Sequence, residues 1–382
     1  MKSFFQDIYA VWRRESRNAI ADKGVMIFLF FVPLFYPIVY ALIYNPELVR
    51  DVPVVVVDNS RSTKSRSLAR KIDASESAKV VGYASNMVEA RECMAEKESY
   101  GIVLIESDFD REIGRGERGD VTLFCDMSLL IRYKALLTAL TEATFDLGSD
   151  IQVESISSMG ANGPSLPPTI DSTYYPLGNP EQGFATFLLP GILVLVMQQT
   201  LLLTIGMMGG AERERRLRFQ DKGRGIFAEI FGKILTYVFL YVAQLVYLFF
   251  LAPMIFRYPQ IGAVSDIILL SLPFALGVIL LGLTLQAFIK ERESSFVFIV
   301  FTSVLLLFLS GISWPLFEMS GFYKFLGGLF PSTWAMQAFV RINANAADLA
   351  DVGYEYKMLW LCTLLYFATT YIAMRYRRAH DK

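Results

Sequence analysis

Six long apolar runs constrain this chain more than any other feature of its sequence. A bilayer hydrocarbon core of roughly 30 Å takes about 20 apolar residues to cross as a helix, and each run is close to that length. The runs cover residues 25–44, 184–208, 231–256, 266–289, 296–312 and 358–374. Hydrophobic residues make up only 54% of the whole chain, because a long polar segment separates the first two runs. The pattern predicts an α-helical integral membrane protein with six transmembrane helices.

Lysine and arginine gather in alternate segments between the runs. They are frequent in the leader 1–24, the loop 209–230 and the tail 375–382, whereas the loop 257–265 has only one. Short flanks rich in these residues stay in the cytoplasm. We therefore expect both termini in the cytoplasm and residues 45–183 outside it. The long charged leader is atypical of a cleaved signal peptide, so the first run is predicted to remain as an anchor.

The segment 45–183 has the pattern of a water-soluble α/β domain. Its expected strands cover residues 52–58, 78–83, 100–105 and 121–125, and its expected helices cover 62–74, 86–98 and 129–149. This order, β-α-β-α-β-β followed by a helix, predicts a small open α/β sheet with right-handed crossovers. Five prolines between residues 160 and 180 predict an extended linker that returns to the second span.

No catalytic, cofactor-binding or metal-binding site is predicted. The one histidine, His380, lies in the tail, so the inserted domain has no histidine for a catalytic triad or a metal site. The acidic residues within 108–112 lack the glycine of a calcium loop and are interpreted as a solvated face. Cys93 and Cys125 fall on a predicted helix and a predicted strand and are expected to stay unbridged. No glycine-rich loop ends in Gly-Lys-Ser or Gly-Lys-Thr, so the energy for any uphill transport must come from elsewhere.

The leader is predicted to form an amphipathic interface helix. Phe5, Ile8, Trp12 and Ile20 recur at near-helical spacing, and the charged residues between them fall mostly on the other side of the helix. Two interpretations stay open. The helix either anchors the chain in the headgroup plane or offers a docking surface to a cytoplasmic partner.

Three amides fall near the middle of the apolar runs: Gln198, Gln199 and Gln244. Unpaired amides are costly in hydrocarbon, so they should face other helices or a polar path. Hydrogen bonding between helices is one interpretation, and a candidate translocation path is the other. No ionisable residue is expected deep in the spans, which argues against a proton-coupled or ion-coupled carrier.

The region 313–357, after the fifth run, is too apolar for a plain external loop. Gly311, Trp314 and Pro315 are expected to end the preceding helix, and Pro331, with the glycines before it, divides the rest into pieces too short to cross. The sequence therefore predicts a re-entrant element of half-membrane helices, which is allowed where protein covers the broken backbone.

A family resemblance rests on four stretches of the sequence. These are WRRESRNAIADKGVMIFLFFVPL from Trp12, VVDNSRSTKSRSLARKI with the later GIVLIESDFDREIGRG, AERERRLRF from Ala211, and SGISWPLFEMSGFYKFLGGLFPSTWAMQAFVRI from Ser310. In this order and membrane context, the chain closely resembles the ABC-2 type membrane permeases. It is most similar to their six-span multidrug-efflux-like branch with a large extracytoplasmic domain, and the resemblance covers essentially the full length.

The resemblance implies roles for two cytoplasmic segments. The leader looks like an interface helix and residues 209–230 look like a coupling loop, the two surfaces on which a separate ABC ATPase sits. Interleaved charges in this loop suit pairing with a partner surface, whereas a simple topology signal would explain the arginines but not the glutamates. The candidate ATPase-coupling residues are Trp12, Arg13, Arg14, Glu15, Arg17, Glu212, Arg213, Glu214, Arg215, Arg216 and Arg218.

The resemblance also implies a gate and has two departures. Gly311, Trp314, Pro315 and Pro331 are candidate residues of a re-entrant gate. Relatives commonly have Gly-Thr and an acidic residue where this chain has Arg-Leu-Arg at 216–218, so the coupling helix is placed only within 211–229. Relatives also usually have Met-Pro where this chain has Met-Ser at 319–320, so the turn there is expected to differ.

Taken as a permease, the chain is expected to form half of the translocation path of an exporter in the bacterial cytoplasmic (inner) membrane. The expected partners are a cytoplasmic ABC ATPase, a second permease (a copy or a sister subunit) and membrane lipid, with a periplasmic adaptor as a further candidate and no nucleic acid. Drug-like or lipid-like amphipathic molecules are the expected substrates. The alternative is a membrane anchor for ATPase-linked envelope or surface machinery that transports no solute. A sensor is disfavoured because the cytoplasmic segments are short.

Overall fold

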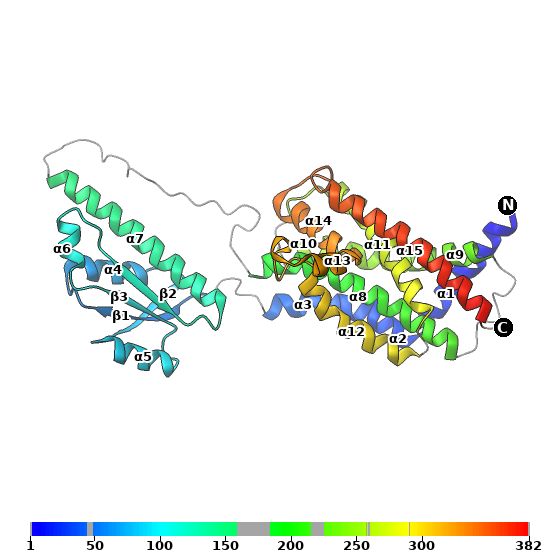
Figure 1. Ribbon diagram of the computed structural model, residues 1–382, viewed down its shortest axis with the longest axis horizontal. Coiled ribbons are helices and arrows are strands. Elements are labelled where there is room, and N and C mark those ends of the chain that lie inside the picture. Colours follow the sequence, from blue (N-terminus) through cyan, green and yellow to red (C-terminus); the bar gives the residue numbers. More distant parts are fainter. Residues whose placement is uncertain are drawn as a thin grey trace. The chain divides into compact units, whose positions relative to one another are not determined.

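The computed structural model describes residues 2–43, 49–158, 184–214, 225–256, 258, 260–289 and 291–380. The chain divides into two compact units. One comprises residues 1–47 and 176–382, and the other comprises residues 48–175. The first is a helical unit and the second an α/β unit (Figure 1).

Six helices of the helical unit are long and apolar enough to cross a membrane, as the sequence predicted. The first candidate span is Lys23–Ile43, built from α2 (Lys23–Met26), a π-helical turn (Ile27–Phe31) and α3 (Val32–Ile43). The second is α8 (Phe184–Glu214), and the third joins α9 (Ile226–Val246), a π-helical turn (Tyr247–Leu251) and α10 (Ala252–Phe256). The last three are α11 (Val264–Gln286), α12 (Arg292–Leu309) and α15 (Gly353–His380).

Shorter helices complete the helical unit. The leader forms α1 (Lys2–Ala21), and the region after α12 forms a 3-10 turn (Leu316–Glu318), α13 (Gly321–Gly328) and α14 (Pro331–Asn345). Both α13 and α14 are too short to cross a bilayer, and they are divided where the glycines and Pro331 predict. The start of α1 and the end of α15 lie at one end of the unit, and α10, α13 and α14 gather at the other (Figure 1).

Helix α8 is the centre of the helical unit. In its most apolar stretch 83% of residues are buried, against 17% in the first candidate span and 22% in the fifth. It packs against α11, α12 and α14. Two of its glycines allow α12 to approach closely, because an added Cβ at Gly210 would lie 2.6 Å from the backbone nitrogen of Arg292 and one at Gly206 would lie 3.0 Å from Ser295. Such small residues at helix contacts are typical of membrane bundles.

Several helices are longer than the apolar runs that predicted them. Helix α9 begins at Ile226, five positions before the predicted run, and α15 spans Gly353–His380 where the run covers 358–374. The additional turns carry charged residues, including Glu229 and Arg377, which hydropathy alone assigns to loops. In the structure Glu229 pairs with Arg378, and Arg377 pairs with Glu212, which lets the helices continue past the apolar runs.

The α/β unit contains a four-stranded sheet in the order β2-β1-β3-β4. Its strands are β1 (Val52–Asp58), β2 (Ala78–Tyr83), β3 (Gly101–Ile105) and β4 (Val121–Cys125). Strand β1 is parallel to both β2 and β3, whereas β4 runs antiparallel to β3. The helices are α4 (Thr63–Asp73), α5 (Met87–Ala95), α6 (Phe109–Gly114) and α7 (Leu130–Ser158). The predicted open α/β sheet is confirmed.

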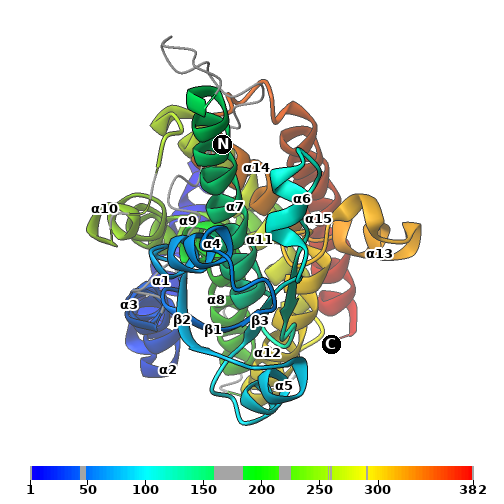
Figure 2. The same cartoon turned by 90° about the vertical axis from the view of Figure 1, so that its left-hand side faces the viewer.

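Helices cover both faces of this sheet. Val54 and Val56 face the side on which α4 and α7 pack, and Val55 and Val57 face the side on which α5 packs. Figures 1 and 2 show α4 and α7 on one side of the strands and α5 on the other. Because both faces are buried, residues 54–57 of β1 are a continuous run of valines without polar alternation.

Two predictions for this unit were wrong in detail. Helix α6 lies between β3 and β4, where the sequence predicted none, and buried Phe109 attaches this short helix to the core. Helix α7 continues to Ser158 where the prediction ended at 149, because Ile151 still packs against the sheet core. Asp108, the N-cap residue of α6, forms an exposed ion pair with Arg111 at 3.1 Å. Cys93 and Cys125 are free thiols, and the predicted linker at 160–180 lies outside the described residues.

Candidate functional site

Helix α1 packs along α9 and is thereby attached to the six spans. Gly232 allows the close approach, because an added Cβ there would lie 2.6 Å from Cβ of Val11. The hydroxyl of Thr236 donates to the carbonyl of Trp12 at 3.4 Å. The indole of Trp12 also meets the ring of Phe239 edge-on at 6.1 Å between centroids. The leader is therefore an integral part of the helical unit.

A set of buried charges joins α1 to the ends of three spans. We call it the ion cluster, and it consists of Arg14, Glu15, Glu212, Glu229, Lys233, Arg377 and Arg378. These residues come from four helices: α1, α8, α9 and α15. The ion cluster has three glutamates and four basic residues, and each of these side chains lies close to one of opposite charge. Four helix ends are thereby fixed to one another through charge pairs.

Lys233 lies at the centre of the ion cluster. Its side chain is 0% exposed, and Nζ lies 3.3 Å from Glu212, 3.8 Å from Glu15 and 3.9 Å from Glu229. It also donates to the side-chain oxygen of Gln286 on α11 at 3.5 Å. A charge buried this completely persists only where partners compensate its loss of hydration. The position of Lys233 therefore depends on carboxylates from α1, α8 and its own helix.

Two arginines of α15 complete the ion cluster. Arg377 lies 3.6 Å from Glu212, and Arg378 lies 2.7 Å from Glu229. All four of these side chains are at least two-thirds buried. The end of the last span is thus tied to both α8 and α9.

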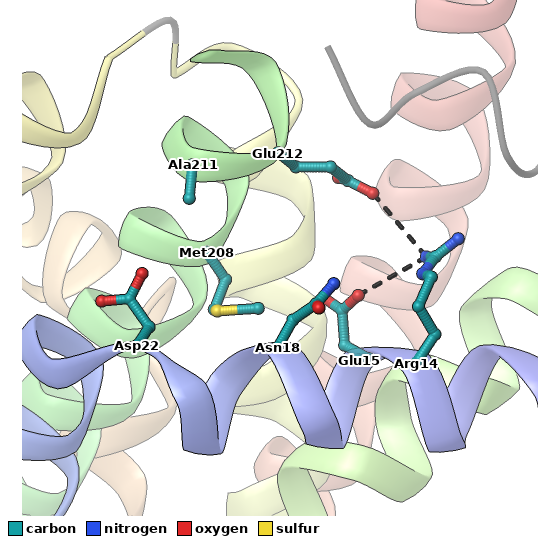
Figure 3. Close-up of a pocket in the computed structure, with 7 residues that line it drawn as sticks. All are labelled: Arg14, Glu15, Asn18, Asp22, Met208, Ala211 and Glu212. Carbon is teal, nitrogen blue, oxygen red and sulfur yellow. Dashed lines mark ion pairs between the residues drawn. The ribbon is translucent and has the colours of Figure 1, made fainter. Parts of the chain in front are cut away.

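Glu15 connects α1 with the interior of the ion cluster. Its carboxylate accepts a hydrogen bond of 3.1 Å from the hydroxyl of Tyr237, and it lies 3.5 Å from Arg14. Burial raises the pKa of Glu15, Lys233 acts in the opposite direction, and the nearby Glu212 carboxylate raises the pKa further. A cavity of about 20 Å³ adjoins this residue, with Arg14, Glu15 and Glu212 on its wall (Figure 3). It has room for about one water molecule.

A second ion pair joins the end of α1 to the start of α12. Asp22 accepts from the backbone nitrogens of Gly24 and Val25, so it caps α2, and its carboxylate also pairs with Arg292. Burial of Asp22 acts to raise its pKa, but hydrogen bonds from Arg292 and from these backbone groups outweigh it, and the pKa is lowered. Arg292 additionally lies 3.6 Å from Glu214 at the end of α8.

The predicted coupling residues separate into exposed and buried positions. Arg13 and Arg17 are exposed on α1, one turn apart, while Trp12 is half-buried. Arg14, Glu15 and Glu212 belong to the ion cluster. Arg213 donates to the carbonyl of Ala287, and Glu214 pairs with Arg292. Arg215, Arg216 and Arg218 lie outside the described residues.

The three amides of the candidate path differ in their contacts. The side-chain nitrogen of Gln198 donates to the hydroxyl of Ser332 at 2.9 Å. Its side-chain oxygen accepts from the backbone nitrogen of Ser332 at 2.8 Å. Gln244 donates to the hydroxyl of Thr200 at 2.9 Å, which joins α9 to α8. The amide of Gln199 is buried and has no hydrogen-bond partner among the described residues. Pairing between helices therefore accounts for Gln198 and for one atom of Gln244.

The candidate gate residues mark turns between helices. Gly311 has a φ of +88°, which places it in the left-handed region that glycine tolerates, directly after α12. Pro315 precedes the 3-10 turn, and Pro331 is the first residue of α14. Trp314 is exposed. Gln198 of α8 holds the N-terminus of α14 through Ser332, so this element is bound to the central helix.

Sequence reasoning missed the centre of this site. Lys233, Glu229, Arg377 and Arg378 were not among the predicted site residues. A signal was present, since Lys233 interrupts an apolar run and Glu229 lies four residues before it, the spacing of an ion pair on one helix. Lys233 lies two turns after the start of α9, near the end of the third span and not deep within it, so it does not contradict the expectation that the middle of the spans carries no ionisable residue.

Comparison with known families covers most of the chain. Residues 23–372 match the family described as ABC-2 family transporter protein. A search of curated proteins found no match. Membrane components of this family pair with ABC ATPase subunits and are not themselves ATPases. The matched region contains all six candidate spans apart from the last turns of α15. The chain therefore belongs to the ABC-2 transporter family, as a multi-pass permease component.

Proposed function

We propose that this chain forms half of the translocation path of an exporter and is driven by a separate ABC ATPase. The ATPase binds at the end of the helical unit where α1 and the ion cluster lie. Positively charged flanks support a cytoplasmic location for this end. Residues 45–183 are then extracytoplasmic. A second copy of the chain, or a sister permease, supplies the other half of the path.

The ion cluster is the observation that carries this proposal. A movement imposed on α1 by a bound ATPase would act on Glu15, and through Lys233 and Glu212 on α9 and α8. Arg377 extends the connection to α15. Because these charges are buried and mutually paired, separating them is costly, and the helix ends should move together.

Arg13 and Arg17 are the proposed docking residues on α1. They lie one turn apart and are exposed, whereas Glu15 between them points into the ion cluster. Exposed guanidinium groups suit charge-assisted bonds to carboxylates of a partner. The two interpretations of the leader are thus combined: one face of α1 holds the helical unit, and the other face is free for a partner or the headgroup layer.

Charge reversal at the exposed arginines tests the docking surface. We expect Arg13→Glu with Arg17→Glu to abolish co-purification of the ATPase while membrane insertion and thermal stability stay normal, because neither residue belongs to the ion cluster. Arg118→Glu is the matched control, a reversal at a 90% exposed side chain of the α/β unit, and should retain the ATPase. Normal ATPase binding by the double variant would contradict this placement.

Amphipathic molecules, drug-like or lipid-like, are the proposed substrates. Support comes from the apolar spans and from Gln199, whose buried amide on the central helix has no partner in the described part of the chain. A substrate or the second permease can satisfy such a group. Gln198 and one atom of Gln244 are already engaged between helices, so Gln199 is the amide that we retain as a path residue.

A further inference from the structure

A cavity of about 600 Å³ lies between α14, α15 and α13, far from the ion cluster. Small-molecule sites commonly have volumes of roughly 300–1,000 Å³. Its apolar wall includes Phe317, Phe325, Leu361 and Leu365, and all four side chains are exposed at the opening. The cavity occupies the first turns of α15, whereas Arg377 and Arg378 lie at the last turns. Because the side chains at its opening are apolar and exposed, the cavity can open toward the hydrocarbon of the membrane.

Two residues that line this cavity each have a buried oxygen with no hydrogen-bond partner in the described part of the chain. Glu355 is 8% exposed, and its Oε1 accepts from Arg341 at 3.0 Å, but its Oε2 has no hydrogen-bond partner among the described residues. Thr333 is 2% exposed, and within the same described residues its hydroxyl is also unpartnered. Glu355 comes from α15 and Thr333 from α14, so two helices each contribute a lining residue with an unpaired acceptor to one cavity.

Such unpaired groups are uncommon in proteins and point to a missing partner. Several other buried threonines of this protein bond to the carbonyl four residues earlier, as Thr363 does with Leu359 at 2.9 Å. Thr333 is the third residue of α14, so no helical carbonyl lies four residues before it. Leaving a buried polar group unpaired typically costs about 1–3 kcal/mol, and more for a charged group. A ligand that donates hydrogen bonds at this position would remove that cost.

We propose that this cavity binds an amphiphile with a protonated amine head. The amine donates to Oε2 of Glu355 and to the hydroxyl of Thr333, and the apolar tail lies against the exposed phenylalanines and leucines. An ammonium group suits the site because the ligand must supply donors and a positive charge next to a carboxylate. The site is a property of this chain alone, so it holds whether or not the chain exports a solute.

The other charges around the cavity favour the same head group. Arg341 is engaged with Glu355 and with the carbonyl of Asp351 at 2.9 Å. Lys324 lies on the exposed side of α13, where it donates to the carbonyl of Phe317 at 3.3 Å. An anionic amphiphile would meet Lys324 at the surface but would face the unpaired carboxylate oxygen inside. An amine is attracted to the inner position and does not need Lys324.

Quenching of Trp334 fluorescence measures binding directly, because this side chain lines the cavity. The full chain, with the other three tryptophans replaced by phenylalanine, would be titrated with a brominated long-chain primary amine. The control ligand is the brominated carboxylate of the same chain length. We expect saturable quenching by the amine and weaker quenching by the carboxylate.

Two polar variants test the assigned acceptors. Glu355→Gln should weaken amine binding by roughly tenfold or more, the loss expected for one charge-assisted hydrogen bond. Thr333→Val keeps the side-chain volume and removes the hydroxyl. It should weaken amine binding several-fold without lowering the thermal stability, because no internal bond of the described chain is lost. Equal amine binding by wild type and both variants would overturn the proposal.

A matched pair of leucine variants tests the apolar wall. Leu361→Phe places a larger ring at the cavity and should reduce quenching, whereas Leu364→Phe changes a nearby exposed leucine that does not line it and should have no effect. Both residues are more than half exposed, so neither change should disturb the fold. Equal effects of the two variants would mean that the amphiphile only partitions nonspecifically.

Mass spectrometry of the purified chain distinguishes the source of the ligand. An aminophospholipid that co-purifies with wild type and is lost in Leu361→Phe identifies membrane lipid as the occupant. Amine binding without a co-purified lipid indicates an amphiphilic solute instead. A disulfide between two copies of the Leu361→Cys variant would show that a second copy of the chain covers this face. That result, together with absent quenching, would contradict the proposal. Amphiphile binding that depends on Lys324 and not on Glu355 would also contradict it.

Discussion

Asp22 combines two tasks at a single position. It caps α2 through its contacts with the backbone nitrogens of Gly24 and Val25, and it pairs with Arg292 at the start of α12. Asparagine is as good an N-cap as aspartate but carries no charge. Substitutions at Asp22 can therefore separate the cap from the ion pair.

Asp22→Asn should destabilise the helical unit less than Asp22→Ala does. The difference should be about 1 kcal/mol, the usual worth of an N-cap, and thermal unfolding in detergent measures it. The gap between wild type and Asp22→Asn should also depend on pH. The pKa of Asp22 is below its ordinary value, so the ion pair stabilises the fold above that ordinary value and is lost as the pH falls through the lowered pKa. A gap that stays constant during acidification would contradict this role for the charge.

At the same scale, the sequence predicted residue types better than residue partners. Arg14, Glu15 and Glu212 were singled out as candidate coupling residues through the family resemblance, and the structure brings them together. Lys233 could not be assigned to them in advance, because its partners come from helices far apart in the sequence. A pattern along one helix shows a pair such as Glu229 with Lys233, but pairing between helices depends on tertiary packing.

Helix α1 owes its position to Gly232. Any side chain there would collide with Val11 and with the carbonyl of Ile8, which would lie 2.6 Å and 3.0 Å from an added Cβ. The contact involves the backbone of Ile8 and the β-branched side chain of Val11, and neither can move away without a movement of the helix. The helix would have to shift, and Glu15 would shift with it.

Gly232→Ala should therefore weaken ATPase co-purification. This effect would be indirect, because residue 232 lies on α9 and not on the exposed face of α1. The variant should also exchange amide hydrogens of α1 faster, which mass spectrometry detects. Gly148→Ala is the matched control, since Gly148 lies in α7 with open space around its added Cβ, and alanine there should leave both readouts unchanged. Normal ATPase binding and unchanged exchange in Gly232→Ala would show that the position of α1 does not depend on this contact.

The elements themselves were largely readable from the sequence. Hydrophobic length gave the six spans, and β-branched runs gave all four strands. The short helix α6 was not predicted, because its six residues are too few to show a helical periodicity of apolar residues and only Phe109 among them is buried. Helix ends were misplaced wherever buried ion pairs prolong a span, as at Glu229 and Arg377, since hydropathy treats every charge as exposed.

For the whole molecule, family membership and architecture agree on a permease component. The ion cluster at one end of the helical unit and the cavity of about 600 Å³ near α13 and α14 are separate sites with different chemistry. The first suits transmission of force from a partner, and the second suits an amphiphile. Some members of the ion cluster were predicted, but neither site could be assembled from the sequence, because each brings together residues of three or more helices.

Transport in proteoliposomes tests the central claim most directly. The chain and its cytoplasmic ABC ATPase would be reconstituted together, with the ATPase face outward, and uptake of a fluorescent amphiphile would be followed after ATP is added. We predict accumulation that requires both proteins, and that stops when the ATPase loses its P-loop lysine, while the purified chain alone hydrolyses no ATP. ATP hydrolysis by the chain alone would contradict the account. A complex that hydrolyses ATP normally but moves no amphiphile would also contradict it, because that is the result expected for a membrane anchor.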